Sequence, residues 1–123
     1  MPTALILFAH GARDPEWASP MRRVQAAIRQ QLADVPVELA FLEFMAPTLP
    51  ECIESLVREG ADKIVIVPMF IARGGHLKRD VPELLDGLRK TYPAVEFSLA
   101  GVIGEEESVV QAMAAAAKNI AGL

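Results

Sequence analysis

The chain has little of what several protein classes require. Its 123 residues include a single cysteine, Cys52, which excludes a disulfide framework, a cysteine-rich zinc site and a two-cysteine redox motif. The formal net charge is −4, so the chain lacks the basic balance typical of a general nucleic-acid-binding protein. No apolar run approaches the roughly 20 residues of a membrane span. We therefore expect a soluble acidic protein with neither a nucleic-acid nor a membrane partner.

The start of the sequence gives no sign of export. Residues 4–9 are apolar, but no basic leader precedes them and the run is too short for a secretory signal. Together with the single cysteine, this favours a cytoplasmic protein. The length suits one hydrophobic core and not two, so we expect a single domain over residues 1–123.

Apolar runs of strand length alternate with stretches of helical period, which is typical of βαβ units and a mostly parallel sheet. The predicted strands are 4–9, 37–44, 64–70 and 95–102, and the predicted helices are 17–33, 48–59, a third that begins at 78 or 80 and ends at 90, and 105–120. The third helix contains Pro82, which we expect in its first turn, where proline is tolerated. Asp80 is expected to cap this helix or to orient a neighbouring histidine.

Right-handed crossovers with helices on both faces favour strand order 2-1-3-4 as the simplest doubly wound arrangement of four strands. The predicted fold class is therefore α/β, a three-layer sandwich around a four-stranded parallel sheet. The third strand, rich in β-branched residues, should be central and covered on both faces. The alanine-rich segment 112–117 is expected to pack closely.

Two histidines, His10 and His76, each follow a predicted buried strand. His10 comes directly after the first strand, and the loop 71–75 leads from the third strand to His76. In the order 2-1-3-4 these two strands are neighbours, and ligands of open α/β sheets bind beyond the carboxyl ends of the strands. Glu43, at the end of the second strand, flanks His10 on the other side. The two imidazoles and the carboxylate are therefore expected to converge.

Mixed nitrogen and oxygen ligands of this kind suit Co(II), Ni(II), Fe(II) or Zn(II). Such a set leaves coordination positions open, which suits catalysis or metal transfer better than a structural metal site. Neutral histidine and a partly desolvated glutamate are also common general bases. The residues alone do not separate a ligand from a base.

Basic side chains and glycines surround these positions in a chain that is acidic overall. The basic residues are Arg13, Arg73, Lys78 and Arg79, and the glycines are Gly11, Gly74 and Gly75. The basic side chains would suit an anionic substrate, particularly one with carboxylates. The glycines would let the backbone pass close to a bulky ligand or adopt a positive φ.

Ordinary structural roles remain open for the same residues. A histidine at a strand end is often only a loop residue, and Glu43 could be a solvated carboxylate. Arg13 could form a weak loop ion pair with Asp14. Trp17 could cover a cavity or anchor its helix, and Cys52 is expected in the core.

Three segments together resemble the class II tetrapyrrole chelatases, and among them the small single-domain sirohydrochlorin chelatases of the CbiX type. They are His10–Pro15, Phe41–Glu43 and Gly74–Pro82. The resemblance covers nearly the whole chain and implies a chelatase-like fold, corresponding to half of a longer two-domain form. Small members are therefore expected to act as homodimers. One departure is Ala12, where relatives often have serine.

The resemblance implies insertion of a divalent metal, typically cobalt, into sirohydrochlorin on the route to cobalamin, with iron or nickel inserted by relatives. His10 and His76 would bind the metal and assist loss of the pyrrole protons, with Glu43 as their acidic partner. The basic side chains would meet the eight carboxylates of sirohydrochlorin, and no permanently bound cofactor is expected.

Two other functions stay open from the sequence. A metal or tetrapyrrole carrier would use the same pocket without turnover. A flavodoxin-like module would bind a phosphate-bearing cofactor, but no glycine-rich phosphate loop follows the first strand.

Overall fold

The computed structural model describes residues 2–123, apart from the side chain of His76. Its sheet is parallel, with the predicted order β2-β1-β3-β4. The strands are β1 (Thr3–Ala9), β2 (Val37–Phe41), β3 (Lys63–Pro68) and β4 (Glu96–Leu99). The helices are α1 (Ser19–Gln31), α2 (Leu49–Arg58), α3 (Gly75–Thr91) and α4 (Glu107–Ile120), with short 3-10 helices η1 (Pro15–Ala18) and η2 (Ile103–Glu105).

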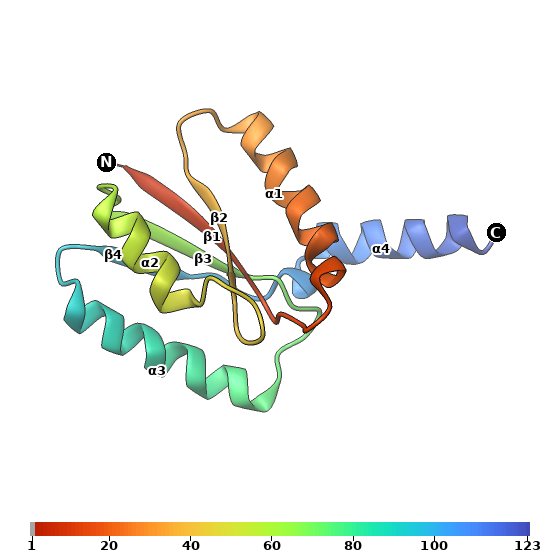
Figure 1. Ribbon diagram of the computed structural model, residues 1–123. Coiled ribbons are helices and arrows are strands. Elements are labelled where there is room, and N and C mark those ends of the chain that lie inside the picture. The colour runs from red at the N-terminus through yellow and green to blue at the C-terminus, as the bar shows by residue number, and fades with distance from the viewer. Residues whose placement is uncertain (1) are drawn as a thin grey trace.

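Alternation along the strands divides the core between the two faces of the sheet. Ile64, Ile66 and Phe97 point to the face covered by α2 and α3. Leu7 and Leu39 point to the opposite face, where α1 packs. Figure 1 shows α1 on one side of the sheet and α2 and α3 on the other. The predicted three-layer α/β sandwich is confirmed.

The second strand is shorter than predicted, because it ends at Phe41 instead of residue 44. The chain turns at Phe44, whose φ of 66° is incompatible with an extended strand. Thr48 then begins α2 by accepting a hydrogen bond from the Glu51 amide, and the Glu51 carboxylate accepts one from the Thr48 amide. This capping box fixes the start of α2.

The third helix starts earlier than predicted. Gly74 is its N-cap, in an extended conformation, so Pro82 lies inside α3 and not in its first turn. Asp80 is likewise inside the helix and does not cap it, so the first of its two predicted roles is wrong, whereas the orientation of His76 stays a prediction. Since proline has no N–H, the Lys78 carbonyl loses its usual partner four residues ahead. The helix tolerates Pro82 in its interior, where the sequence argument did not place it.

Two packing predictions are wrong. The segment 112–117 does not pack closely, because none of the residues of α4, all of which the structure describes, is buried. The third strand is central, but Val65 and Val67 on its α1 side are only half-buried. The physical reason is the same in both cases, since α4 extends away from the sheet (Figure 1).

Within residues 2–123, no helix combines the length and the apolar character that crossing a membrane requires.

Candidate functional site

The carboxyl ends of β1 and β2 bring His10 and Glu43 together. The Leu42 amide donates to the Ala9 carbonyl, and the Glu43 amide donates to the His10 carbonyl, so the two chain segments remain paired beyond the strands. The Glu43 Oε1 atom lies 2.8 Å from His10 Nε2. Both side chains are about half exposed, at 51% and 49%. The pair is therefore fixed by the backbone and open to a ligand.

Gly11 makes this pairing possible. Its φ is +93°, and a Cβ atom built at this position would overlap the Glu43 carbonyl oxygen. Glycine alone combines that backbone conformation with so close an approach. The expectation of a positive φ is thus confirmed for Gly11. Gly74, whose φ is −83°, and Gly75 are not among the positive-φ glycines of residues 2–123, so for these two only the alternative, a backbone that passes close to a ligand, stays a prediction.

Arg13 and Phe44 form a second contact beside the His10–Glu43 pair. The guanidinium carbon of Arg13 lies 4.9 Å from the centroid of the Phe44 ring, in a cation–π arrangement. Phe44 is 57% exposed. Asp14 instead accepts a hydrogen bond from the Glu16 amide and caps η1. An exposed aromatic ring and a guanidinium group therefore stand next to the His10–Glu43 pair.

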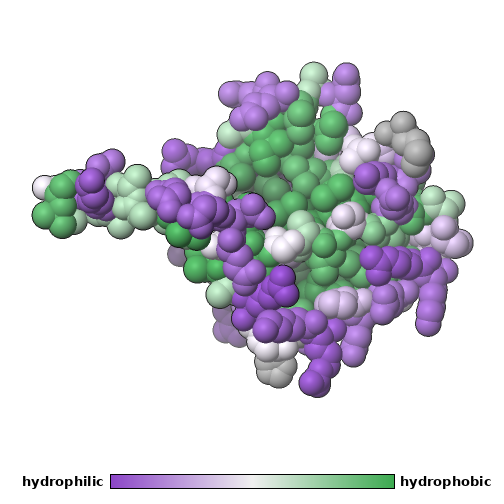
Figure 2. Space-filling model, turned by 180° about the vertical axis from the view of Figure 1, so that it is seen from behind, coloured by the Kyte–Doolittle hydropathy of each residue, from purple (hydrophilic) through white to green (hydrophobic). Residues whose placement is uncertain are grey.

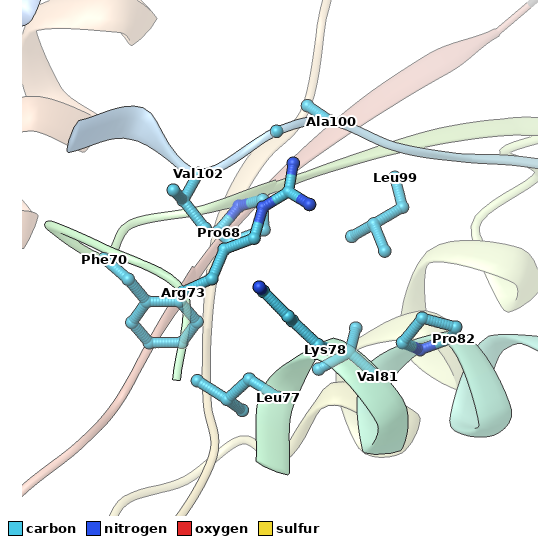
Figure 3. Close-up of a pocket in the computed structure, with 11 residues that line it drawn as sticks. Pro68, Phe70, Arg73, Leu77, Lys78, Val81, Pro82, Leu99, Ala100 and Val102 are labelled. Atoms are coloured by element: carbon cyan, nitrogen blue, oxygen red, sulfur yellow. The ribbon is translucent and has the colours of Figure 1, made fainter. Parts of the chain in front are cut away.

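A cavity of about 460 Å³ opens at the same edge of the sheet, beyond the ends of β3 and β4. Arg73 and Lys78 extend into it among apolar side chains, as Figure 3 shows. The apolar part of the wall includes Phe70, Leu77 and Leu99. Neither His10 nor Glu43 lines this cavity. The edge thus has two parts, the His10–Glu43 pair over β1 and β2 and a basic cavity over β3 and β4.

Of the remaining predicted residues whose side chains are described, only Arg73 and Lys78 line the cavity. Arg73 Nε lies 3.8 Å from Glu105 Oε2, so its charge is partly balanced from η2. Arg79 is exposed and is not one of the residues that line the cavity. Gly74 and Gly75 form the start of α3, and a Cβ atom at either would meet no neighbour within 4 Å.

For His76 the structure describes the backbone position alone, so it does not test whether the His76 side chain converges with His10. His76 lies in the first turn of α3, and its side chain is outside the described part of the structure. Among the side chains that are described, no group of three or more His, Cys, Asp and Glu residues could hold a metal ion. The roles of His10, His76 and Glu43 in metal binding stay predictions.

Cys52 is not a candidate ligand. It is buried at 3% exposure on α2. Burial raises the pKa of its thiol to about 12, with smaller contributions from Glu38 and Glu59. Because metals bind the thiolate, this side chain stays protonated and packs in the core, as expected.

Sequence reasoning missed two residues of this edge, Phe44 and Glu105. Phe44 contacts Arg13 only because its backbone adopts the left-handed conformation. Glu105 reaches Arg73 because η2 follows β4 at the same edge. The only sequence signals were the position of Phe44 directly after Glu43 and that of Glu105 beyond the last strand.

Known proteins resemble the chain over nearly its whole length. Residues 4–120 match the family model CbiX. A sirohydrochlorin cobaltochelatase of Saccharolobus solfataricus is 34% identical over 111 residues, which cover 85% of each chain. Another, from Methanococcus aeolicus, is 42% identical over 82 residues, which cover 67% of this chain and 57% of that protein. The match thus spans just over half of the second relative.

Two solved structures also resemble the chain. A putative cobalamin biosynthesis CbiX protein of Marinobacter aquaeolei superposes with a TM-score of 0.86, 26% identity and 98% coverage of both chains. The sirohydrochlorin chelatase SirB of Bacillus subtilis subspecies spizizenii, in complex with cobalt, gives a TM-score of 0.83 and 28% identity. That match covers 98% of this chain and 51% of SirB. From the family match and these likenesses, the chain belongs to the CbiX family.

Proposed function

We propose that the protein inserts a divalent metal, cobalt in the first place, into sirohydrochlorin during cobalamin biosynthesis. The observation that carries the proposal is the His10–Glu43 pair, held half exposed at the ligand-binding edge of a CbiX-family fold. The relatives from Saccharolobus and Methanococcus are named sirohydrochlorin cobaltochelatases. SirB was solved with cobalt and with Fe³⁺, so iron is the second candidate metal and nickel the third.

The reaction requires that two pyrrole N–H bonds break while the metal binds the ring nitrogens, with release of two protons. An ionised carboxylate can only accept a hydrogen bond, so beside Glu43 the His10 Nε2 atom carries the hydrogen and Nδ1 keeps its lone pair. His10 Nδ1 would present the metal or accept a proton. Glu43 has two alternative roles: through this hydrogen bond it orients the ring and stabilises the imidazolium form, or it releases the bond and binds the same metal as His10.

The substrate would be held through its carboxylates. Arg73 and Lys78 extend into the cavity beside the pair, and Arg13 lies with Phe44 on the other side. Charge-assisted hydrogen bonds from such groups to carboxylates are stronger than hydrogen bonds between neutral groups. Arg79 and the Gly74–Gly75 backbone are proposed as further contacts at the rim. His76, at the start of α3, would join His10 and Glu43 as a metal ligand.

We further propose that the protein acts as a cytoplasmic homodimer with no permanently bound cofactor. This chain matches about half of SirB, with 51% coverage of that chain. A second copy would therefore supply the half of the fold that the longer chelatase carries in one polypeptide.

The test is the loss of free sirohydrochlorin absorbance when purified protein is added with Co²⁺, Fe²⁺ or Ni²⁺ in turn, against controls without protein. Multiple turnovers with one metal would support a chelatase and rank the metals. Stoichiometric binding without turnover with any metal would overturn the proposal in favour of a carrier.

A further inference from the structure

Three consecutive glutamates, Glu105, Glu106 and Glu107, follow β4 where the chain enters α4, and all three are exposed. Figure 2 shows hydrophilic residues at the base of the projecting α4, where this run lies. Glu107 accepts a hydrogen bond from Gln111 of its own helix. Glu105 instead faces another segment of the chain, because its Oε2 atom lies 3.8 Å from Arg73 Nε. One carboxylate of the run therefore reaches a basic residue of the cavity.

Backbone contacts hold Glu105 next to Arg73. The Gly104 amide donates to the Phe70 carbonyl over 2.9 Å. A Cβ atom at Gly104 would overlap the Ile71 backbone, so η2 is seated directly against the loop that carries Arg73. The two charged side chains are thus brought together by the backbone, and not by the chance meeting of two long side chains.

The ion pair itself is weak enough to exchange. A distance of 3.8 Å is too long for a hydrogen bond, and the two side chains are 50% and 52% exposed. Ion pairs with such exposure contribute little free energy. Glu105 therefore balances part of the charge of Arg73 without fixing the direction of the guanidinium group. A carboxylate that accepts two hydrogen bonds from the same group would displace it.

The cavity is where such a competing carboxylate would enter. Arg73 and Lys78 both point into it, as Figure 3 shows. Arg73 Nη2 would lie 3.9 Å from a Cβ atom built at Gly101, a residue of the cavity wall, so this end of the guanidinium group faces the cavity while Nε faces Glu105. None of the ion pairs among the described side chains includes Lys78. An entering anion thus meets one unpaired cation and one that Glu105 partly neutralises.

The proposed reaction gives this competition a consequence. The metal replaces two protons at the centre of the tetrapyrrole, and the carboxylates at its rim are the same in substrate and product. A contact with a rim carboxylate therefore holds both molecules equally and does not lower the barrier to metal insertion. If that contact is too strong, it slows the release of the product.

From these observations we infer that Glu105 determines how strongly the tetrapyrrole is held: its carboxylate competes with a rim carboxylate of the ligand for Arg73. The competition weakens the binding of substrate and of metal-bearing product by the same factor. This rests on the proposed function for the identity of the ligand, and it adds the residue that limits the affinity.

The test measures two constants for wild-type protein, Glu105→Gln and the control Glu106→Gln. Titration with metal-free sirohydrochlorin, followed by its absorbance, gives Kd, and inhibition by cobalt-sirohydrochlorin gives the affinity for the product. Both glutamates are exposed and glutamine keeps their shape, so both variants should fold. Glu105→Gln should lower both constants by the same factor, up to about fivefold. Glu106→Gln removes the same charge and should change them much less, since none of the ion pairs among the described side chains includes Glu106.

The same substitution in an Arg73→Gln background identifies the partner of Glu105. Loss of the guanidinium group should raise Kd about tenfold, which titration still measures. In this background Glu105→Gln should have no further effect, because there is no guanidinium group left to compete for. An equal gain in affinity with and without Arg73 would overturn the inference in favour of a general effect of charge. An unchanged or raised Kd for Glu105→Gln with Arg73 intact would also overturn it, since Glu105 would then not compete with the ligand.

The outcomes separate the inference from the proposed function. Wild-type protein that inserts metal, with constants that Glu105→Gln leaves unchanged, overturns the inference alone. Wild-type protein that binds sirohydrochlorin without turnover overturns the chelatase, and the titrations still decide the role of Glu105. Wild-type protein that does not bind sirohydrochlorin overturns both.

Discussion

Glu43 is joined to His10 twice, once through its amide, which donates to the His10 carbonyl, and once through its carboxylate, 2.8 Å from His10 Nε2. The backbone bond sets the distance between the two strand ends, and the side-chain bond sets the orientation of the imidazole. A carboxylate that fixes a histidine in this way leaves the second ring nitrogen available for a metal or a proton.

Gly11→Ala should destabilise the fold and disturb the pair. The new Cβ would overlap the Glu43 carbonyl, and alanine at φ +93° is strained, so we expect a loss of about 1–3 kcal/mol in the free energy of unfolding. Chemical denaturation measures this loss, and chelatase activity should fall at temperatures where the variant is still folded.

The matched control is Gly87→Ala. Gly87 lies inside α3, and a Cβ atom there meets nothing within 4 Å. Alanine favours a helix interior over glycine, so this variant should be more stable by roughly 0.5–1 kcal/mol. Equal stability changes in the two variants would show that the close approach of Gly11 to Glu43 is unimportant.

Lys78→Gln should weaken substrate binding more than turnover. Lys78 extends into the cavity at the sheet edge and would contact a substrate carboxylate. Loss of one charge-assisted contact should raise KM for sirohydrochlorin about tenfold with kcat little changed, because the contact exists before and during the reaction. Steady-state kinetics measures both, and Lys90→Gln in the last turn of α3 is the control. A fall in kcat at unchanged KM would contradict this role.

Cys52 should make the protein less stable in alkaline solution. Burial raises the pKa of its thiol from 9.0 to about 12, so the unfolded chain loses this proton first. The contribution to stability is complete below pH 9 and is lost between about pH 9 and 12, by up to roughly 1.4 kcal/mol per pH unit. The difference between wild-type protein and Cys52→Ala in urea unfolding, followed across this range, isolates the effect. Parallel pH profiles would refute it.

The fold could be predicted well because its strands are marked by apolar runs and its helices by apolar stripes. The runs around Ile6 and Ile66 are buried strands of the sheet, and the crossover rules leave few orders for four strands. The boundaries depended on local backbone conformations that composition does not show, such as the positive φ of Phe44 and the extended Gly74.

The placement of α4 could not be predicted from its amphipathic pattern. The spacing of Val110, Met113 and Ile120 predicts that the helix packs on an apolar surface, but none of the residues of α4 is buried in the structure. The helix begins three residues after Gly104, whose close contact with the Ile71 backbone is not visible in the periodic pattern.

At the site, parallel topology alone brought Glu43 beside His10, because the carboxyl ends of neighbouring strands meet at one edge. The cavity was not foreseen as a separate part of that edge. Its apolar wall includes Leu77 and Leu99 of β4. Leu77 lies in the first turn of α3, and the helix was predicted to begin after this residue.

The most direct test of the account is a double-mutant cycle on the His10–Glu43 pair. The value of kcat/KM for Co²⁺ insertion into sirohydrochlorin is measured for wild-type protein, His10→Ala, Glu43→Gln and the double variant. Glu54→Gln, an exposed carboxylate on α2, is the control. If the two residues act as one unit, each single variant loses roughly a hundredfold and the double variant loses little more. Single variants that keep full activity, or a double variant whose loss is the product of the two, would contradict the account.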